Sequence, residues 1–218
     1  MRVSDPIEDQ DDVLSSTAAL AGRWRPPFAR VVEGFLDDDG CRALLERITA
    51  LEPAAAPVTT MRGAVMRPDI RNNERVMFDD VALAAALFAR ARSFLPATLF
   101  GEPRTTQTSG DAWEAVGLNE RFRGYRYRPG QRFTPHFDGC FARSPDEQSA
   151  ITWLLYLDEA CAGGETRLLD FGVVVRPRRG TLFLFDHYVL HEGAEVLSGV
   201  KHVLRSDVMY RRVSRASS

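Results

Sequence analysis

The stretch Arg132-Phe133-Thr134-Pro135-His136-Phe137-Asp138-Gly139 determines how we interpret the rest of the sequence. It carries a histidine and an aspartate two positions apart, His136 and Asp138. Side chains of an extended strand point alternately to opposite faces, so residues two apart share a face. An imidazole and a carboxylate are both common metal ligands. The stretch therefore predicts part of a metal site whose remaining ligand comes from elsewhere in the chain.

The remaining ligand must come from the other histidines, which are few. The chain has four in all: His136, His187, His191 and His202. Two imidazoles and one carboxylate on one side of a metal leave open coordination positions opposite, the arrangement found in non-haem Fe(II) oxygenases. Both His191 and His187 are candidates, and their spacing resembles the H-x-x-x-H of zinc proteases. That motif needs a helix and a glutamate after its first histidine, whereas Tyr188 follows here in strand-like sequence.

The second half of the chain has the texture of a β-structure. From Trp113 onward, short apolar or alternating runs are separated by turn residues such as Pro129-Gly130 and Gly163-Gly164. Eight short strands at this spacing predict a β-sandwich or jelly roll over residues 113–213. The runs are Arg121–Tyr127, Phe133–Asp138, Ile151–Leu157, Thr166–Leu169, Val173–Val175, Thr181–Phe185, Ala194–Val196 and Lys201–Tyr210.

The first half predicts helical support for that core within one domain, residues 23–213. Residues 1–22 are acidic and then rich in small residues, which favours a flexible tail. Aspartates precede two segments with helical spacing, 41–51 and 81–95, and these helices are expected to pack on one sheet. Between them, the irregular stretch Arg62–Arg75 is either a lid over the site or a surface connection.

Composition excludes several classes of protein. The chain has 218 residues, 44% of them hydrophobic, a net charge of −2 and a pI of about 6.1, so neither nucleic acid nor a membrane is an expected partner. Three scattered cysteines and an acidic N-terminus without an apolar core predict a reducing, cytoplasmic location. Cys140 is interpreted as a loop thiol. Arginines between Arg121 and Arg132 are interpreted mainly as a solvated strand face.

At this point the sequence resembles a known family. RYRPGQRFTPHFD, YLDEACAGGET, GTLFLFDH, HEGAEVLSGVK and SDVMYRR occur in the family order between about Asn119 and Arg212. They resemble the Fe(II)/2-oxoglutarate-dependent dioxygenases, specifically the prolyl 4-hydroxylase-like branch. The resemblance implies a mainly β fold with flanking α-helices, whose core is a double-stranded β-helix (jelly roll, cupin-like). Residues 1–112 are matched only by the family's habit of placing helices before this core.

The resemblance also implies a set of catalytic metal ligands. His136, Asp138 and His191 match the residues that bind Fe(II) in the family. Two features favour His191 over His187: the ten-residue step from His191 to Lys201, and the Glu192-Gly193 directly after His191. We interpret His187 as a residue just outside the ligand set. Halogenating relatives replace the carboxylate by a small residue, so Asp138 favours hydroxylation.

Further residues are implied in binding the co-substrate. Lys201 matches the basic residue that holds the distal carboxylate of 2-oxoglutarate, and a buried carboxylate needs such a charge-assisted partner. Tyr127 and Tyr156 match co-substrate-binding tyrosines, and Thr166 is implied to face the same cavity. Arg205 shares a strand face with Lys201 and is expected to assist the 2-oxoglutarate carboxylate, contact substrate or remain a surface residue.

The activity implied is hydroxylation of an unactivated C–H bond with O2, releasing succinate and CO2, with ascorbate as the expected reductant. A prolyl or similar residue of a protein or peptide is the expected substrate. A free amino acid or small metabolite is the alternative, and a non-catalytic cupin-like binding module is a third interpretation. A nucleic-acid demethylase is disfavoured by the acidic pI.

Overall fold

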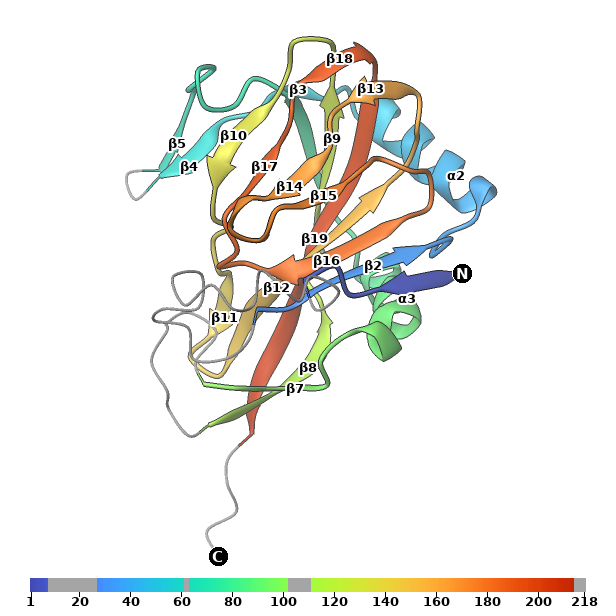
Figure 1. The fold of residues 1–218 in the computed structure, drawn as a ribbon. Helices are drawn as coiled ribbons and strands as arrows, with labels where there is room; N and C mark the ends of the chain where they lie inside the picture. Colours follow the sequence, from blue (N-terminus) through green and yellow to red (C-terminus); the bar gives the residue numbers. More distant parts are fainter. Residues whose placement is uncertain (8–26, 61–62, 102–110, 214–218) are drawn as a thin grey trace, which may run out of the picture.

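Two antiparallel β-sheets pack against each other around the centre of the molecule (Figure 1). The computed structural model describes residues 1–7, 27–60, 63–101 and 111–213. The large sheet has eleven strands, and its main path runs β1-β2-β16-β12-β19-β9-β6-β3. These strands are β1 (Arg2–Ser4), β2 (Ala29–Glu33), β16 (Leu182–Asp186), β12 (Glu147–Tyr156), β19 (Lys201–Val213), β9 (Arg121–Tyr127), β6 (Glu74–Asp79) and β3 (Ala54–Ala55), joined by β7 (Thr98–Phe100), β8 (Ala112–Leu118) and β11 (Ala142–Ser144).

The small sheet runs in the order β10-β17-β14-β15. Its strands are β10 (Phe133–His136), β17 (His191–Gly193), β14 (Thr166–Leu168) and β15 (Val173–Val175), and a 3-10 turn, η2 (Leu169–Phe171), joins the last two. Two further pairs are β13 (Cys161–Gly163) with β18 (Val196–Gly199), and β4 (Val58–Thr60) with β5 (Gly63–Val65). The prediction of a mainly β fold with helices on one sheet is confirmed.

Two helices begin at the aspartates that the sequence marks as caps. In α2 (Asp38–Ala50), the Asp37 carboxylate accepts a hydrogen bond from the Gly40 N–H at 2.8 Å. In α3 (Val81–Ala91), Asp80 accepts one from the Leu83 N–H at 2.9 Å, and the short turn η1 (Arg92–Phe94) follows. Their apolar faces, among them Ile48 and Leu87, pack against the outer face of the large sheet.

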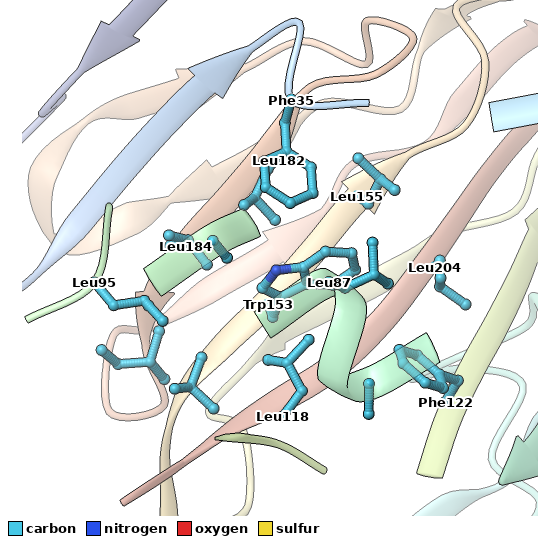
Figure 2. Close-up of a cluster of buried hydrophobic side chains, with 14 of the residues drawn as sticks. Phe35, Leu87, Leu95, Leu118, Phe122, Trp153, Leu155, Leu182, Leu184 and Leu204 are labelled. Atoms are coloured by element: carbon cyan, nitrogen blue, oxygen red, sulfur yellow. The ribbon is translucent and has the colours of Figure 1, made fainter. Parts of the chain in front are cut away.

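The core between helices and large sheet surrounds Trp153 (Figure 2). Its indole is fully buried and meets the ring of Phe35 edge to face, with centroids 5.8 Å apart. Leu87 of α3 and Leu155 and Leu204 of the sheet lie around it in Figure 2. Aromatic side chains bury much area in specific geometry, so this core fixes how the helices lie on the sheet.

A second core fills the space between the two sheets, and the site lies at its edge. Residues 123, 125 and 127 of β9 face this interior, whereas Phe122 and Gly124 face the helices. Tyr125, Tyr127 and Tyr156 of the large sheet pack here with Leu168 of the small sheet. The side-chain alternation predicted from the sequence thus separates a structural face from a functional face.

The N-terminal region differs from the expectation of a flexible tail followed by helical support. Residues 2–4 pair with β2, with Val3 opposite Val32, and Ile7 is only 1% exposed. The tail prediction is therefore wrong for residues 1–7, because burying Ile7 and completing the sheet edge hold them in place. Residues 8–22 lie outside the described residues. The support region also contributes strands, among them β2 and β6, to the large sheet.

The stretch Arg62–Arg75 is more regular than its sequence suggests. Arg62 lies outside the described residues, but β5 pairs with β4 in a hairpin beside β10 (Figure 1). Arg71 forms a bridge to Phe133, and the Thr134 N–H donates to the Ile70 carbonyl at 2.9 Å. The stretch is thus attached to the metal-site strand, and its role as a lid stays a prediction.

Neither helix in the described ranges is long and apolar enough to cross a membrane.

The contact between α2 and β9 allows no side chain at Gly124. A Cβ atom built there would lie 2.6 Å from Ile48 Cγ1, well inside van der Waals contact. We expect Gly124→Ala to lower the free energy of unfolding by about 1–3 kcal/mol, because it overpacks this core. Urea unfolding measures the change. Gly117→Ala is the control, since nothing lies within 4 Å of its Cβ position. Equal stability of the two variants would contradict the packing.

Candidate metal centre

The three predicted ligands lie together at one end of the small sheet. His136 ends β10, Asp138 follows it, and His191 begins β17 directly opposite His136 in the antiparallel register. One ligand atom from each lies within 4.8 Å of the others. Asp138 Oδ1 is 3.9 Å from His136 Nε2, and its Oδ2 is 3.6 Å from His191 Nε2. Two imidazoles and a carboxylate therefore converge on one point.

Backbone hydrogen bonds orient both imidazoles toward that point. Nδ1 of His136 lies 2.8 Å from the Thr134 carbonyl oxygen, and Nδ1 of His191 lies 2.9 Å from that of Val189. A carbonyl only accepts, so both Nδ1 atoms carry the proton, and each Nε2 keeps its lone pair for a cation. Pro135 is tolerated between these residues because β10 is an edge strand of its sheet.

Aromatic rings shield the two histidines. Phe133 stacks on His136 with centroids 3.5 Å apart, and Phe185 meets His191 edge to face at 4.7 Å. Burial, together with the neighbouring His191, lowers the pKa of His136 to about 3, and burial also lowers the pKa of His191. Both rings are therefore neutral at pH 7, the state in which imidazole binds a metal.

Asp138 is held by a hydroxyl and a guanidinium. Thr152 Oγ1 donates to Asp138 Oδ2 at 2.5 Å, and Arg205 Nη2 lies 2.9 Å from Asp138 Oδ1. Burial alone would raise the pKa of this carboxyl, but Arg205 and the two histidines hold it well below its usual range. The carboxylate is thus ionised and fixed toward the histidines, which suits it to a cation.

A chain of hydrogen bonds connects Asp138 with His187. Because Thr152 donates its only hydroxyl proton to Asp138, it accepts from His187 Nδ1–H, 3.0 Å away. His187 Nε2 in turn accepts from Ser149 Oγ at 2.9 Å. His187 is fully buried and acts one step away from the ligand set, as interpreted from the sequence. Thr152 was missed, although a hydroxyl in the apolar run Ile151–Leu157 needs a buried partner.

The three ligands line a cavity that also reaches Lys201, the only lysine of the chain. It is 3% exposed and donates to the Gly164 carbonyl at 2.6 Å. Its ammonium lies 4.9 Å from the Tyr127 ring centre and 5.8 Å from that of Tyr156. In the described part of the chain, no carboxylate lies within ion-pair distance of it. A buried ammonium with spare donors calls for an anionic ligand.

The remaining residues predicted to bind co-substrate line the same cavity. Tyr127, Thr166 and Lys201 lie on its wall together with the three ligands. Tyr156 is buried beside it and donates from its hydroxyl to Thr166 Oγ1 at 2.7 Å. Burial raises the pKa of Tyr127 to about 12, so its hydroxyl stays protonated and able to donate. The structure thus gathers all of them around one space.

The structure also shows where two further residues, Arg205 and Cys140, lie relative to the ligand cluster. The interpretation of Arg205 as a surface residue is wrong: its side chain is 13% exposed and pairs with Asp138 and, at 3.1 Å, with Asp207. It lies at the metal end, four residues or about 13 Å along β19 from Lys201. The Cys140 thiol donates to the Ser149 carbonyl at 2.9 Å and is outside the ligand cluster.

Comparison with known proteins agrees with this geometry. Residues 122–206 match the family model of the 2OG-Fe(II) oxygenase superfamily. Prolyl 4-hydroxylase subunit alpha-1 of Homo sapiens is 29% identical over 104 residues, which cover 40% of this chain and 20% of the relative. The chain therefore spans only about a fifth of the relatives it matches in sequence.

Solved structures of prolyl hydroxylases share the fold. A viral collagen prolyl hydroxylase from Paramecium Bursaria Chlorella virus-1, in complex with 2OG, has a TM-score of 0.54 at 21% identity, covering 84% of this chain and 96% of the other. A prolyl hydroxylase from Trichoplax adhaerens, in complex with a peptide fragment of the hypoxia inducible factor oxygen degradation domain, has a TM-score of 0.57 at 14% identity, with coverage of 92% and 90%.

These matches indicate what the chain is similar to. Residues 122–206 resemble the 2OG-Fe(II) oxygenase superfamily, and the chain shares its jelly-roll fold with solved prolyl hydroxylases. The matching sequence relatives are prolyl 4-hydroxylase subunits.

The residues present fit the groups that this family implies. Three neutral or anionic ligands with free lone pairs suit Fe(II), which the 2-His-1-carboxylate arrangement binds with open positions for 2-oxoglutarate and O2. The buried ammonium of Lys201 donates to the Gly164 carbonyl and has no carboxylate partner among the described residues, which suits it to the distal carboxylate of 2-oxoglutarate.

The Thr152 contact is expected to set metal affinity. Thr152→Val keeps the size of the side chain but removes the hydroxyl that fixes Asp138. We expect Mn(II) or Fe(II) to bind about 10–100-fold more weakly, as measured by titration of the metal-free chain. Thr152→Ser restores the hydroxyl and is the control. Unchanged affinity in the valine variant would exclude this role.

Lys201 is expected to make 2-oxoglutarate binding depend on pH. Burial lowers its pKa from the ordinary 10.5 to about 8. Only the ammonium form pairs with a carboxylate, so affinity stays flat below pH 8 and falls by up to about tenfold per pH unit above it. Calorimetry with the Mn(II)-loaded chain measures this profile. Lys201→Met should bind weakly and show no fall in this range, and a wild-type profile without a fall would contradict the assignment.

Proposed function

We propose that the chain is an Fe(II)- and 2-oxoglutarate-dependent dioxygenase that hydroxylates a prolyl or similar residue of a protein or peptide. One observation carries the proposal: a preformed cluster of two histidines and an aspartate shares a cavity with a buried ammonium that has no anionic partner among the described residues. The first feature suits the metal and the second suits the co-substrate, and few other activities need both.

The chemistry of the bound groups is supplied from outside the chain. With 2-oxoglutarate and O2, bound Fe(II) supplies the oxidant that replaces a C–H hydrogen with hydroxyl, while 2-oxoglutarate leaves as succinate and CO2. The protein itself has two tasks: to hold the metal and the co-substrate in place and to exclude water from them. His136, Asp138 and His191 would hold the metal from one side, Lys201 would orient the co-substrate, and the rings of Phe133 and Phe185 would shield the two histidines from water.

The choice of a peptide substrate is supported by the relatives. Prolyl 4-hydroxylase subunits match in sequence, and a relative of the same fold is described in complex with a peptide fragment. A free amino acid or small metabolite is the alternative substrate.

We further propose ascorbate as the reductant that keeps the metal in its ferrous state, and a cytoplasmic location. The location is supported by Cys41, Cys140 and Cys161, which are all free thiols.

The test of this function is substrate-dependent turnover. Purified protein with Fe(II), ascorbate, O2 and 2-oxoglutarate is incubated with a library of proline-containing peptides, and succinate and peptide mass are measured. We expect succinate formation coupled to a peptide that gains one oxygen, and loss of both by at least about a thousandfold in Asp138→Ala. Oxygen gained only by free amino acids would favour the alternative. Full turnover in Asp138→Ala would refute the ligand assignment.

A further inference from the structure

Four arginines gather beside the metal centre, more than the structure there requires. Three of them lie on the inner face of the large sheet: Arg75 of β6, Arg123 of β9 and Arg205 of β19. The fourth, Arg71, lies just before β6 in the chain. Arg75 lies directly opposite Tyr125, and Arg123 lies directly opposite Arg205. Arg123 is an exception within the arginine-rich stretch that was interpreted mainly as a solvated strand face, since its side chain is 21% exposed and pairs with buried Asp207 at 2.9 Å.

This arrangement breaks a general rule of sheet pairing. Like charges directly opposite on neighbouring strands destabilise a sheet, and here Arg123 and Arg205 share one buried aspartate, Asp207. Burial alone would raise the pKa of the Tyr125 hydroxyl, yet the arginines around it lower that pKa to about 8. The positive potential at this wall is therefore strong. Departures from local rules of this kind are expected at functional sites.

Two of the four guanidinium groups have no anionic partner among the residues that the structure describes. Arg71 is 5% exposed and lies between the rings of Tyr125 and Phe133, 4.6 and 4.5 Å from their centres. Its Nε donates to Asn73 at 2.6 Å, but its buried Nη2 has no hydrogen-bond partner. Over the described ranges, Arg75 also lacks a carboxylate within ion-pair distance. A buried donor without an acceptor is costly, so a ligand is expected to supply one.

The metal and the co-substrate do not remove this excess charge. A dication and the dianion of 2-oxoglutarate cancel each other, and Lys201 is committed to the distal carboxylate at the other end of the cavity. Asp138 is committed to the metal. The unpaired charge of Arg71 and Arg75 therefore remains for a third component, which is the substrate.

A cleft on the same wall gives that substrate a place. It has a volume of about 320 Å³, and Arg75, Arg123, Met77 and Phe141 are among its lining residues. Two carboxylates, Asp79 and Glu120, also line it, but they pair with Arg121 and Arg143. Met77 is 44% exposed and Phe141 is 40% exposed, so the cleft also offers apolar surface to a ligand. Arg205, which lies opposite Arg123 in the neighbouring strand, lines the central cavity. The cleft and the cavity are therefore neighbours across one pair of strands.

We propose that Arg71 and Arg75 form a subsite for a carboxylate of the substrate, and that this substrate is an acidic peptide, with aspartate or glutamate close to the hydroxylated residue. The inference rests on the proposed function, which places the reacting carbon at the metal. Arg75 faces the cleft and is the group that selects the acidic side chain. Arg71, fixed by two rings and Asn73, is preorganised to complete the binding.

Peptide binding tests this without turnover. Fluorescein-labelled prolyl peptides that differ only at one position, Glu, Gln or Lys, are titrated by anisotropy against the full chain with Mn(II) and 2-oxoglutarate. We expect the Glu peptide to bind at least about tenfold more tightly than the Gln peptide, through charge-assisted hydrogen bonds, and this ratio to fall at high salt. Equal affinities for the three peptides, with Glu placed at each position near the proline in turn, would overturn the proposal.

Variants of Arg75 identify the group responsible. Arg75→Gln should remove most of the Glu-over-Gln preference, Arg75→Lys should retain much of it, and Arg75→Glu should shift the preference toward the Lys peptide. Arg132→Gln is the matched control, because Arg132 is half-exposed, pairs with Glu195 and lies outside the cleft. An unchanged ratio in both Arg75→Gln and Arg75→Glu would exclude the subsite.

Two further measurements separate this inference from the proposed function. If peptides gain oxygen with Fe(II) regardless of their charge, the function stands and the acidic subsite is overturned. If acidic peptides bind selectively but never gain oxygen, the subsite stands and the function fails. Competition by free proline or free aspartate as strong as that by the Glu peptide would assign the carboxylate to a small metabolite and overturn the peptide proposal.

Discussion

The antiparallel pairing of β10 with β17 is the constraint on which the site depends. It sets His136 opposite His191, and the short step to Asp138 then completes the ligand cluster. β10 is short and interrupted by Pro135, so it holds its position only through neighbours: β17 on one side and the backbone of residues 70–72 on the other. The large sheet and its helices give these neighbours a fixed support, which is why so much of the chain serves so few ligand atoms.

Burial makes every charge in the cavity depend on a partner. Asp138 is ionised because the Arg205 guanidinium faces it and offsets the cost of burial, and the pKa of Lys201 is lowered because burial disfavours its charge. The two ends of the cavity therefore differ in whether their charged groups already have partners. At the metal end, Asp138 already has fixed partners in Arg205 and Thr152, whereas at the other end the described residues give Lys201 no carboxylate. This difference would favour one orientation of a ligand that carries a carboxylate for Lys201.

Local pattern in the sequence predicted what local chemistry determines. The alternation in β9, the aspartates that cap α2 and α3, and the two-residue step from His136 to Asp138 are each properties of a few neighbouring residues. Contacts between distant segments could not be predicted in this way. Thr152 reaches Asp138, and Arg71 reaches Tyr125, only because strands far apart in the chain become neighbours in the folded sheets. The buried start of the chain was missed for the same reason, since its partner strand begins at Ala29.

The wall of arginines shows how the metal and the substrate site are connected. Arg205 pairs with Asp138 and with one oxygen of Asp207, and Arg123 pairs with the other oxygen of Asp207. When Asp138 ligates a cation, less of its negative charge is left for Arg205, so the guanidinium groups nearby become less well balanced. An anion entering the cleft then gains more than it would in the metal-free chain. If the proposed acidic subsite exists, occupation of the metal centre would therefore strengthen its attraction for an acidic partner, through charges that lie on one pair of strands.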